Sequence, residues 1–75
     1  EAEHGLAEKR GFVVEALKHL PEKKRAAVVL RDIEGLSTRE VAGILGSSEV
    51  TVRSQVSSAR MKMKRFLERR LKRRS

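Results

Sequence analysis

Apolar residues recur at intervals of three or four along nearly the whole chain, and no segment alternates with a period of two. This spacing is typical of α-helices, so we expect an all-α protein. A first helix is predicted at residues 6–19, where four apolar residues share one face: Leu6, Val13, Leu17 and Leu20. Gly11 inside this helix costs about 1 kcal/mol relative to alanine.

A second helix is predicted at residues 21–34, because Pro21 suits the first position of a helix and Gly35 suits the position after its end. Its expected packing positions are Ala26, Val29, Leu30 and Ile33. A third helix should follow at once, since Ser37 and Glu40 have the spacing of a capping box. It is expected to end at Gly46 and to carry Val41, Ala42, Ile44 and Leu45.

The fourth helix is predicted to begin after Ser47 or Ser48, either of which can cap its first turn. Its apolar stripe continues close to the C-terminus and consists of Val52, Val56, Ala59, Met63 and Phe66. A short helix, a glycine turn and a longer helix make a helix-turn-helix, which inserts its second helix into the DNA major groove. We therefore expect a small four-helix domain with a C-terminal helix-turn-helix.

The other face of the fourth helix is polar and mostly short: Thr51, Arg53, Ser54, Gln55, Ser57 and Ser58. Short hydroxyl side chains let a helix approach base edges closely, and Arg53 and Gln55 can each make two hydrogen bonds, to guanine and adenine respectively. A solvated helix surface is the simpler alternative. However, hydroxyl residues are poor helix formers, so four of them within residues 51–58 favour DNA contact.

The charge is concentrated at one end of the chain. Its 75 residues, enough for one domain with a thin core, carry a net charge of +8. Residues 1–59 hold equal numbers of basic and acidic side chains, whereas residues 60–75 hold nine basic side chains against Glu68 alone. This asymmetry indicates a polyanionic partner, with a solvated helix end as the alternative.

Several function classes are excluded or disfavoured. Cysteine is absent, which excludes disulfides, zinc–thiolate sites and cysteine nucleophiles, and we expect a reducing, cytoplasmic location. No apolar run is long enough to span a membrane, and the cations of residues 60–75 surround the helix rather than forming a membrane-binding face. His4 and His19 have no acidic cluster beside them, and Met61 and Met63 are expected to fill packing gaps. We expect no enzymatic activity, no metal and no cofactor.

Over about residues 15–67, the order and spacing of several short segments resemble region four of bacterial sigma factors, above all the extracytoplasmic-function (ECF) group. The segments are Leu20-Pro21-Glu22, Leu30-Arg31-Asp32, Glu34-Gly35-Leu36-Ser37, Glu40-Val41-Ala42, Leu45-Gly46-Ser47-Ser48, Thr51-Val52-Arg53-Ser54 and Ala59-Arg60. The resemblance implies a four-helix unit that reads the −35 promoter element. Another face is implied to dock on the flap of the RNA polymerase β subunit, and an anti-sigma protein commonly masks such a domain.

The resemblance also assigns roles to single residues. It implies DNA contact by Thr51, Arg53, Ser54, Ser57 and Ser58, with Arg39 and Arg60 on phosphates. We add Gln55 from its place on the polar face. Many relatives carry arginine at the positions of Gln55 and Ser58, so this face is less cationic and the promoter sequence does not carry over. The candidates for the protein-binding face are Leu17, Val28 and Val29.

Two rival interpretations stay open. The output domain of response regulators shares the Gly-Leu-Ser-x-x-Glu-Val-Ala and Thr-Val-Arg segments, but it normally continues with a histidine and an Asn–Ile pair that this chain lacks. A pure protein-interaction module, with the basic end on an acidic partner, is the other. We expect residues 1–5 to be a linker remnant, residues 6–67 the domain and residues 68–75 a basic tail, all within a longer sigma factor.

Overall fold

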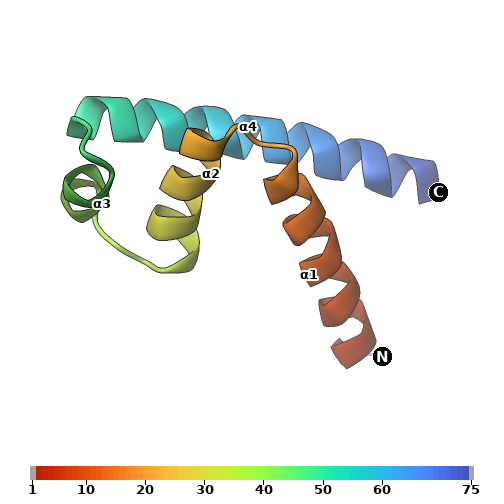
Figure 1. Ribbon diagram of the computed structural model, residues 1–75. Helices are drawn as coiled ribbons and strands as arrows, with labels where there is room; N and C mark the ends of the chain where they lie inside the picture. The colour runs from red at the N-terminus through yellow and green to blue at the C-terminus, as the bar shows by residue number, and fades with distance from the viewer. Residues whose placement is uncertain (1, 75) are drawn as a thin grey trace.

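One long helix organises the protein, and three shorter helices pack along it (Figure 1). The structure, a computed structural model, describes the backbone of residues 2–74 and the side chains of residues 10–72. The elements follow in the order α1 (Ala2–Lys18), α2 (Glu22–Val28), η1 (Val29–Ile33), α3 (Thr38–Leu45) and α4 (Glu49–Arg74). The all-α prediction is confirmed, and no strand occurs within residues 2–74.

Helix α4 sets the length of the molecule. Its 26 residues span about 39 Å at 1.5 Å per residue, which matches the longest dimension of 41 Å. α2 and α3 lie against its first half, whereas α1 meets it near the middle and projects away (Figure 1). The predicted continuation of this helix almost to the C-terminus is confirmed, so residues 68–74 are part of α4 rather than a separate tail.

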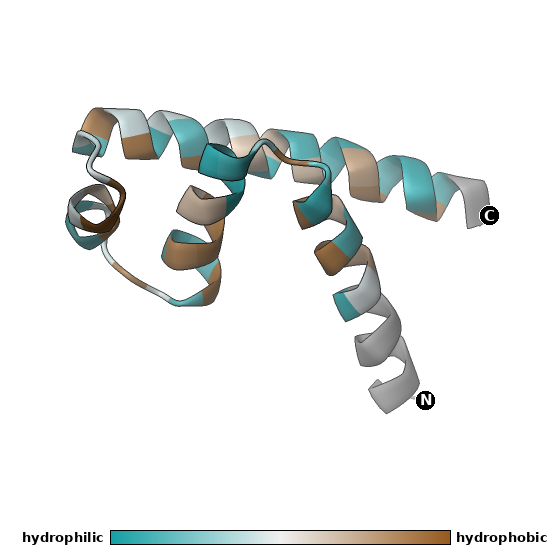
Figure 2. Ribbon diagram, viewed as in Figure 1, coloured by the Kyte–Doolittle hydropathy of each residue, from teal (hydrophilic) through white to brown (hydrophobic). Residues whose placement is uncertain are grey.

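The core fills the angle between α2, α3 and α4, where hydrophobic positions gather in Figure 2. It consists of Leu20, Ala27, Val28, Val41, Ala42, Val52, Val56 and Ala59. Val41 and Val52 are the largest side chains that are fully buried. The predicted inward positions of α3 and α4 are therefore largely confirmed, except that Ile44 is 61% exposed.

The packing face predicted for the second helix is partly wrong. Val29 and Leu30 pack against the core as expected, but Ala26 is only half-buried and Ile33 is 58% exposed. Ala27 and Val28 are buried instead. α2 contacts α4, whereas η1 contacts α3. The second helix therefore buries two neighbouring faces, whereas a prediction from one apolar stripe assumes a single buried face.

The start of the second helix and its widened end also differ from the prediction. Pro21 caps the helix rather than occupying its first position. Its last turn is π-helical, with the Glu34 amide donating to the Val29 carbonyl over 2.9 Å. Gly35 follows with φ +76°, a conformation that favours glycine, so it ends the helix as predicted.

The turn between α3 and α4 forms as the sequence indicates. The Glu40 amide donates to Ser37 Oγ over 3.1 Å, and the Ser37 amide donates to Glu40 Oε1 over 2.9 Å. This capping box begins α3 at Thr38, and Gly46 ends it with φ +66°. Of the two candidate caps of α4, Ser48 is the one used, since its Oγ accepts the Thr51 amide over 3.1 Å.

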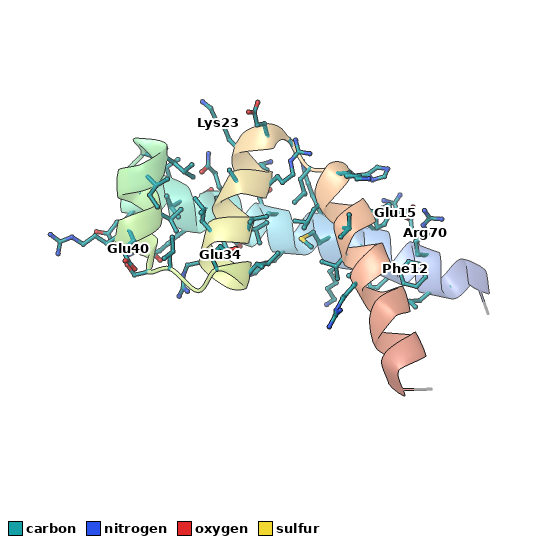
Figure 3. The ribbon with its side chains drawn as sticks, turned by 60° about the horizontal axis from the view of Figure 1, so that its bottom comes forward. Phe12, Glu15, Lys23, Glu34, Glu40 and Arg70 are labelled. Atoms are coloured by element: carbon teal, nitrogen blue, oxygen red, sulfur yellow. The ribbon has the colours of Figure 1, made fainter. Side chains whose placement is uncertain are left out.

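Helix α1 is held against the second half of α4 by polar and aromatic contacts. Glu15 forms an ion pair with Arg70, and the two side chains approach each other in Figure 3. His19 lies 4.7 Å from Phe66 between ring centroids. α1 begins at Ala2, earlier than predicted, and the Leu6 side chain lies outside the described residues. The linker-remnant interpretation of residues 1–5 stays a prediction.

Candidate DNA-binding surface

The exposed face of the first turns of α4 carries most of the predicted base-reading residues. Thr51, Arg53, Ser54 and Ser57 are exposed, and Ser58 is half-buried. Ser48 Oγ donates to Thr51 Oγ1 over 2.9 Å, so the Thr51 hydroxyl keeps its own proton for an acceptor such as a base edge or a phosphate. This face is therefore short, polar and open to a partner.

Arg53 is the longest of these side chains and has only a weak partner. Its Nη2 lies 3.5 Å from Glu49 Oε1 one turn earlier, and 63% of the Arg53 side chain is exposed. An exposed ion pair of this kind contributes little to stability, so Arg53 can leave Glu49 at little cost in free energy to bind a stronger partner. The guanidinium keeps the fork geometry that matches the O6 and N7 atoms of guanine.

Gln55 does not lie on the free face, contrary to the prediction. It is half-buried, and its Oε1 atom is covered without a hydrogen-bond partner among the described residues. The reason is the helix period, which places position 55 beside the buried Val52 and Ala59. A DNA contact by Gln55 stays untested, but its side chain would have to leave this position first.

Arg60 is exposed and is held by a carboxylate from another element. Its Nε and Nη2 donate to Asp32 Oδ2 and Oδ1 over 2.7 and 2.5 Å, which joins α4 to η1. These hydrogen bonds, and then the positive charge, hold the pKa of Asp32 below its ordinary value of 3.8. The Nη1 group of Arg60 donates to no acceptor among the described residues, so the predicted phosphate contact does not require the pair to break.

A basic hollow of about 290 Å³ lies between η1, the start of α3 and α4. Its lining residues are Arg31, Thr38, Arg53, Val56, Ser57 and Arg60. Sequence reasoning missed Arg31, whose Nη1 donates to the Leu36 carbonyl over 3.2 Å. No sequence pattern around Arg31 indicates a DNA-binding role. Arg31 comes to lie beside Arg53 and Arg60 only through the π-helical turn and the packing of η1.

Arg39 lies in the first turn of α3 and is exposed, as a phosphate-contacting residue must be. It follows Thr38, which lines the basic hollow. Its placement agrees with the predicted role but does not test it. Together with the hollow it extends the cationic surface from α4 onto α3.

A second, apolar surface lies between α1, η1 and α4. We call it the apolar groove; its volume is about 520 Å³, and its lining residues are Val13, Leu17, Val28, Asp32, Ile33, Arg60, Met63, Lys64, Leu67, Glu68 and Leu71. Two of the three predicted partner-binding residues, Leu17 and Val28, line it, but Val29 does not. Val28 is only 3% exposed, so the expectation that it forms uncovered surface is wrong.

The sequence had no way to single out the most exposed residues of the apolar groove. Ile33 and Leu71 are 58% and 55% exposed and lie 38 positions apart in the sequence, in η1 and α4. Within the described residues, no helix has the length and apolarity needed to cross a membrane. The same residues contain no group of three or more histidine, cysteine or carboxylate side chains placed to hold a metal ion.

The family profile of sigma-70 region 4 matches residues 13–63, from the middle of α1 to the middle of α4. The chain belongs to the sigma-70 region 4 family. This match confirms the resemblance to region four of sigma factors. The match gives no support to the response-regulator output domain.

Similar proteins are sigma factors. The ECF RNA polymerase sigma factor SigE of Mycolicibacterium smegmatis is 48% identical over 52 residues, which are 69% of this chain and 20% of that protein. The ECF sigma factor SigM of Mycobacterium tuberculosis is 44% identical over 55 residues, which are 73% of this chain and 28% of that protein. The sigma factor SigZ of Bacillus subtilis is 41% identical over 69 residues; the match covers 83% of this chain and 39% of that protein. The chain thus spans between a fifth and two fifths of the length of these relatives.

Proposed function

We propose that this chain is the promoter-recognition domain of an alternative sigma factor of the ECF type, and that α4 reads the −35 element in the major groove. The observation that carries the proposal is the open, short, polar face of α4, the capped second helix of the helix-turn-helix, in a chain of the sigma-70 region 4 family. The role is binding rather than catalysis. Because promoter DNA and RNA polymerase are its partners, the location is the bacterial cytoplasm.

The test is selection of DNA by the purified chain from a randomised duplex pool. We expect a single short consensus, and we expect Arg53→Ala to cost about 1–3 kcal/mol of binding and to relax the preference at one base pair. Arg10→Ala is the matched control, since Arg10 is an exposed arginine of α1 away from this face. A wild-type chain that selects no consensus would contradict the proposal, and an unchanged consensus for Arg53→Ala would show that another helix reads the DNA.

We further propose that the apolar groove receives the flap of the RNA polymerase β subunit, and that an anti-sigma protein competes for it. The apolar lining of the groove supports this proposal, as do the exposed side chains of Ile33 and Leu71. A protein bound over these two residues removes their apolar surface from water. Its rim carries Arg60 and Lys64 as well as Asp32 and Glu68, so charged contacts are available at its edges.

Ile33→Asp is the informative variant, because Ile33 is exposed and its replacement leaves the core intact. We expect it to lower binding to an isolated flap domain at least tenfold. Ile44→Asp is the control, since Ile44 is equally exposed but lies on α3 outside the groove. Equal binding by the two variants would place the flap elsewhere. Val28→Asp is unsuitable, because a charge at a buried position unfolds the domain.

A further inference from the structure

The cations of α4 divide into paired and unpaired groups. Three arginines have a carboxylate within salt-bridge distance: Arg53, Arg60 and Arg70. The other described cations of α4 have no carboxylate partner among the described residues; they are Lys62, Lys64, Arg65, Arg69 and Lys72. Three of them lie together in one hollow between α1 and α4: Lys62, Arg65 and Arg69. We call these three the basic stripe. Their charge is therefore available to an anion from outside the molecule.

The basic stripe lines two adjoining hollows. One, of about 310 Å³, lies between α1 and α4 and contains all three cations together with Ala16, His19, Leu20 and Phe66. The other, of about 380 Å³, lies along α4 and contains Ser54, Ser57, Ser58, Met61, Lys62 and Arg65. Lys62 and Arg65 belong to both, and neither hollow is lined by a carboxylate. The unpaired cations are thus continuous with the hydroxyl face that the DNA is proposed to meet.

A lysine of α2 adds to this concentration of charge. Lys24 lies close to Lys62, and the contact with this side chain, followed by the repulsion between the two ammonium groups, lowers the pKa of Lys24. Like charges held together without a counter-charge are unfavourable in the free protein. An anion bound between them relieves that repulsion, so the fold itself favours an anionic ligand here.

The spacing of the basic stripe indicates which anion it meets. Ser54, Ser58, Lys62, Arg65 and Arg69 follow one another at intervals of three or four, so they lie along one side of α4. Ser54 and Arg69 are separated by about 22 Å at 1.5 Å per residue. The major groove is only about 12 Å wide. A helix whose first turns occupy the groove therefore carries its later turns over the groove edge, where the phosphates lie.

We propose that Lys62, Arg65 and Arg69 form a DNA phosphate-binding site, which contacts the sugar–phosphate backbone beyond the base pairs that the first turns of α4 read. The inference rests on the proposed function, since it uses the orientation of α4 in the groove. It goes beyond the family match, because Arg65 and Arg69 lie outside residues 13–63. The stripe binds any DNA sequence and adds affinity without adding base preference.

The test compares two double variants of equal charge in the 75-residue chain. Lys62→Ala with Arg65→Ala removes two cations of the stripe, whereas Arg10→Ala with Lys18→Ala removes two exposed cations elsewhere, both on α1. Each lost phosphate contact reduces the slope of log affinity against log salt by about 0.9. We expect the slope to fall by about 2 for the stripe variant and to stay within about 0.5 of the wild type for the control.

Three outcomes decide the matter. A smaller slope for the stripe variant, with an unchanged consensus and an unchanged melting temperature, supports the proposal. Equal slopes for both variants overturn it. An unchanged slope together with lost binding to purified RNA polymerase core also overturns it, because the stripe is then a protein-binding surface. Failure of the proposed function is distinguishable, since in that case the wild-type chain itself selects no DNA sequence.

Discussion

Arg53 and Gln55 are two positions apart on α4, yet only Arg53 is free to reach a partner. On sequence alone both belong to one polar run, and residue type predicts base contact for each. The burial of Gln55 depends on the exact direction of the core, which the apolar stripe indicates only to within a fraction of a helical turn. The predicted DNA-binding residues therefore separate into an exposed group and two half-buried members, Gln55 and Ser58.

At this scale we expect Gln55→Leu to be neutral or stabilising by about 1 kcal/mol. The Oε1 atom of Gln55 is buried without a partner among the described residues, and replacing an unsatisfied polar group by an apolar one removes its desolvation cost. Urea denaturation measures the stability. DNA selection should give the wild-type consensus, and Ser54→Leu, on the exposed face, is the control that should disturb it. A changed consensus for Gln55→Leu would show that Gln55 turns outward on binding.

At the scale of elements, the caps of α3 and α4 are the features that local sequence determines best. Ser37, Glu40 and Gly46 were predicted from their spacing, because a capping box and a left-handed glycine involve only residues within one turn. The choice between Ser47 and Ser48 stayed open for the same reason, since either hydroxyl fits the local pattern. The structure resolves it through the hydrogen bonds of Ser48 with Thr51.

This resolution gives a matched pair of variants. We expect Ser48→Ala to lower the free energy of unfolding by about 1 kcal/mol, because it removes the acceptor of the Thr51 amide. Ser47→Ala should change it by less than about 0.5 kcal/mol, because Ser47 donates to the Ala42 carbonyl through its backbone amide, which the variant keeps. Chemical denaturation of both variants checks this. Equal effects, or a larger effect at Ser47, would contradict the assigned cap.

The parts of the elements that the sequence did not predict are those decided by packing between segments. The buried face of α2 and η1 was misplaced because two neighbours cover it rather than one. The pair of Asp32 and Arg60 joins residues 28 positions apart, and no pattern within either helix indicates it. The apolar groove was anticipated through Leu17 and Val28, but its exposed apolar residues, Ile33 and Leu71, come from η1 and α4, which meet only in the fold.

For the whole molecule, the two proposed partners approach α4 from different sides. The groove residues of α4, such as Lys64, Leu67 and Leu71, lie roughly opposite Ser58, Lys62 and Arg65 at 100° per residue. From Ser58 onward, α4 therefore presents the basic stripe on one side and the apolar groove on the other. Arg60 is the exception, because it lines both the apolar groove and the basic hollow beside Arg53. The two proposed partners therefore meet largely different residues of α4.

The pair of Asp32 and Arg60 joins the two segments on which these surfaces depend, and it makes stability sensitive to pH. The folded state holds the pKa of Asp32 below its ordinary value of 3.8. A carboxyl whose pKa is depressed by folding contributes stability above its unfolded pKa and loses that contribution as the pH falls through the folded pKa. We therefore expect Asp32→Asn to be less stable than the wild type at neutral pH, because it removes a doubly hydrogen-bonded charge partner.

That difference in stability should shrink as the pH falls below the ordinary pKa of Asp32 and through its lower folded pKa, since the wild-type carboxyl becomes protonated there. Urea midpoints of both chains across this pH range measure it. Glu34→Gln is the control, because Glu34 is an exposed carboxylate two residues after Asp32 with no ion pair among the described residues. Its difference from the wild type should be small at every pH. A difference for Asp32→Asn that persists undiminished at low pH would mean that Asp32 stabilises the fold through its shape and packing, with the charge of Arg60 playing no part.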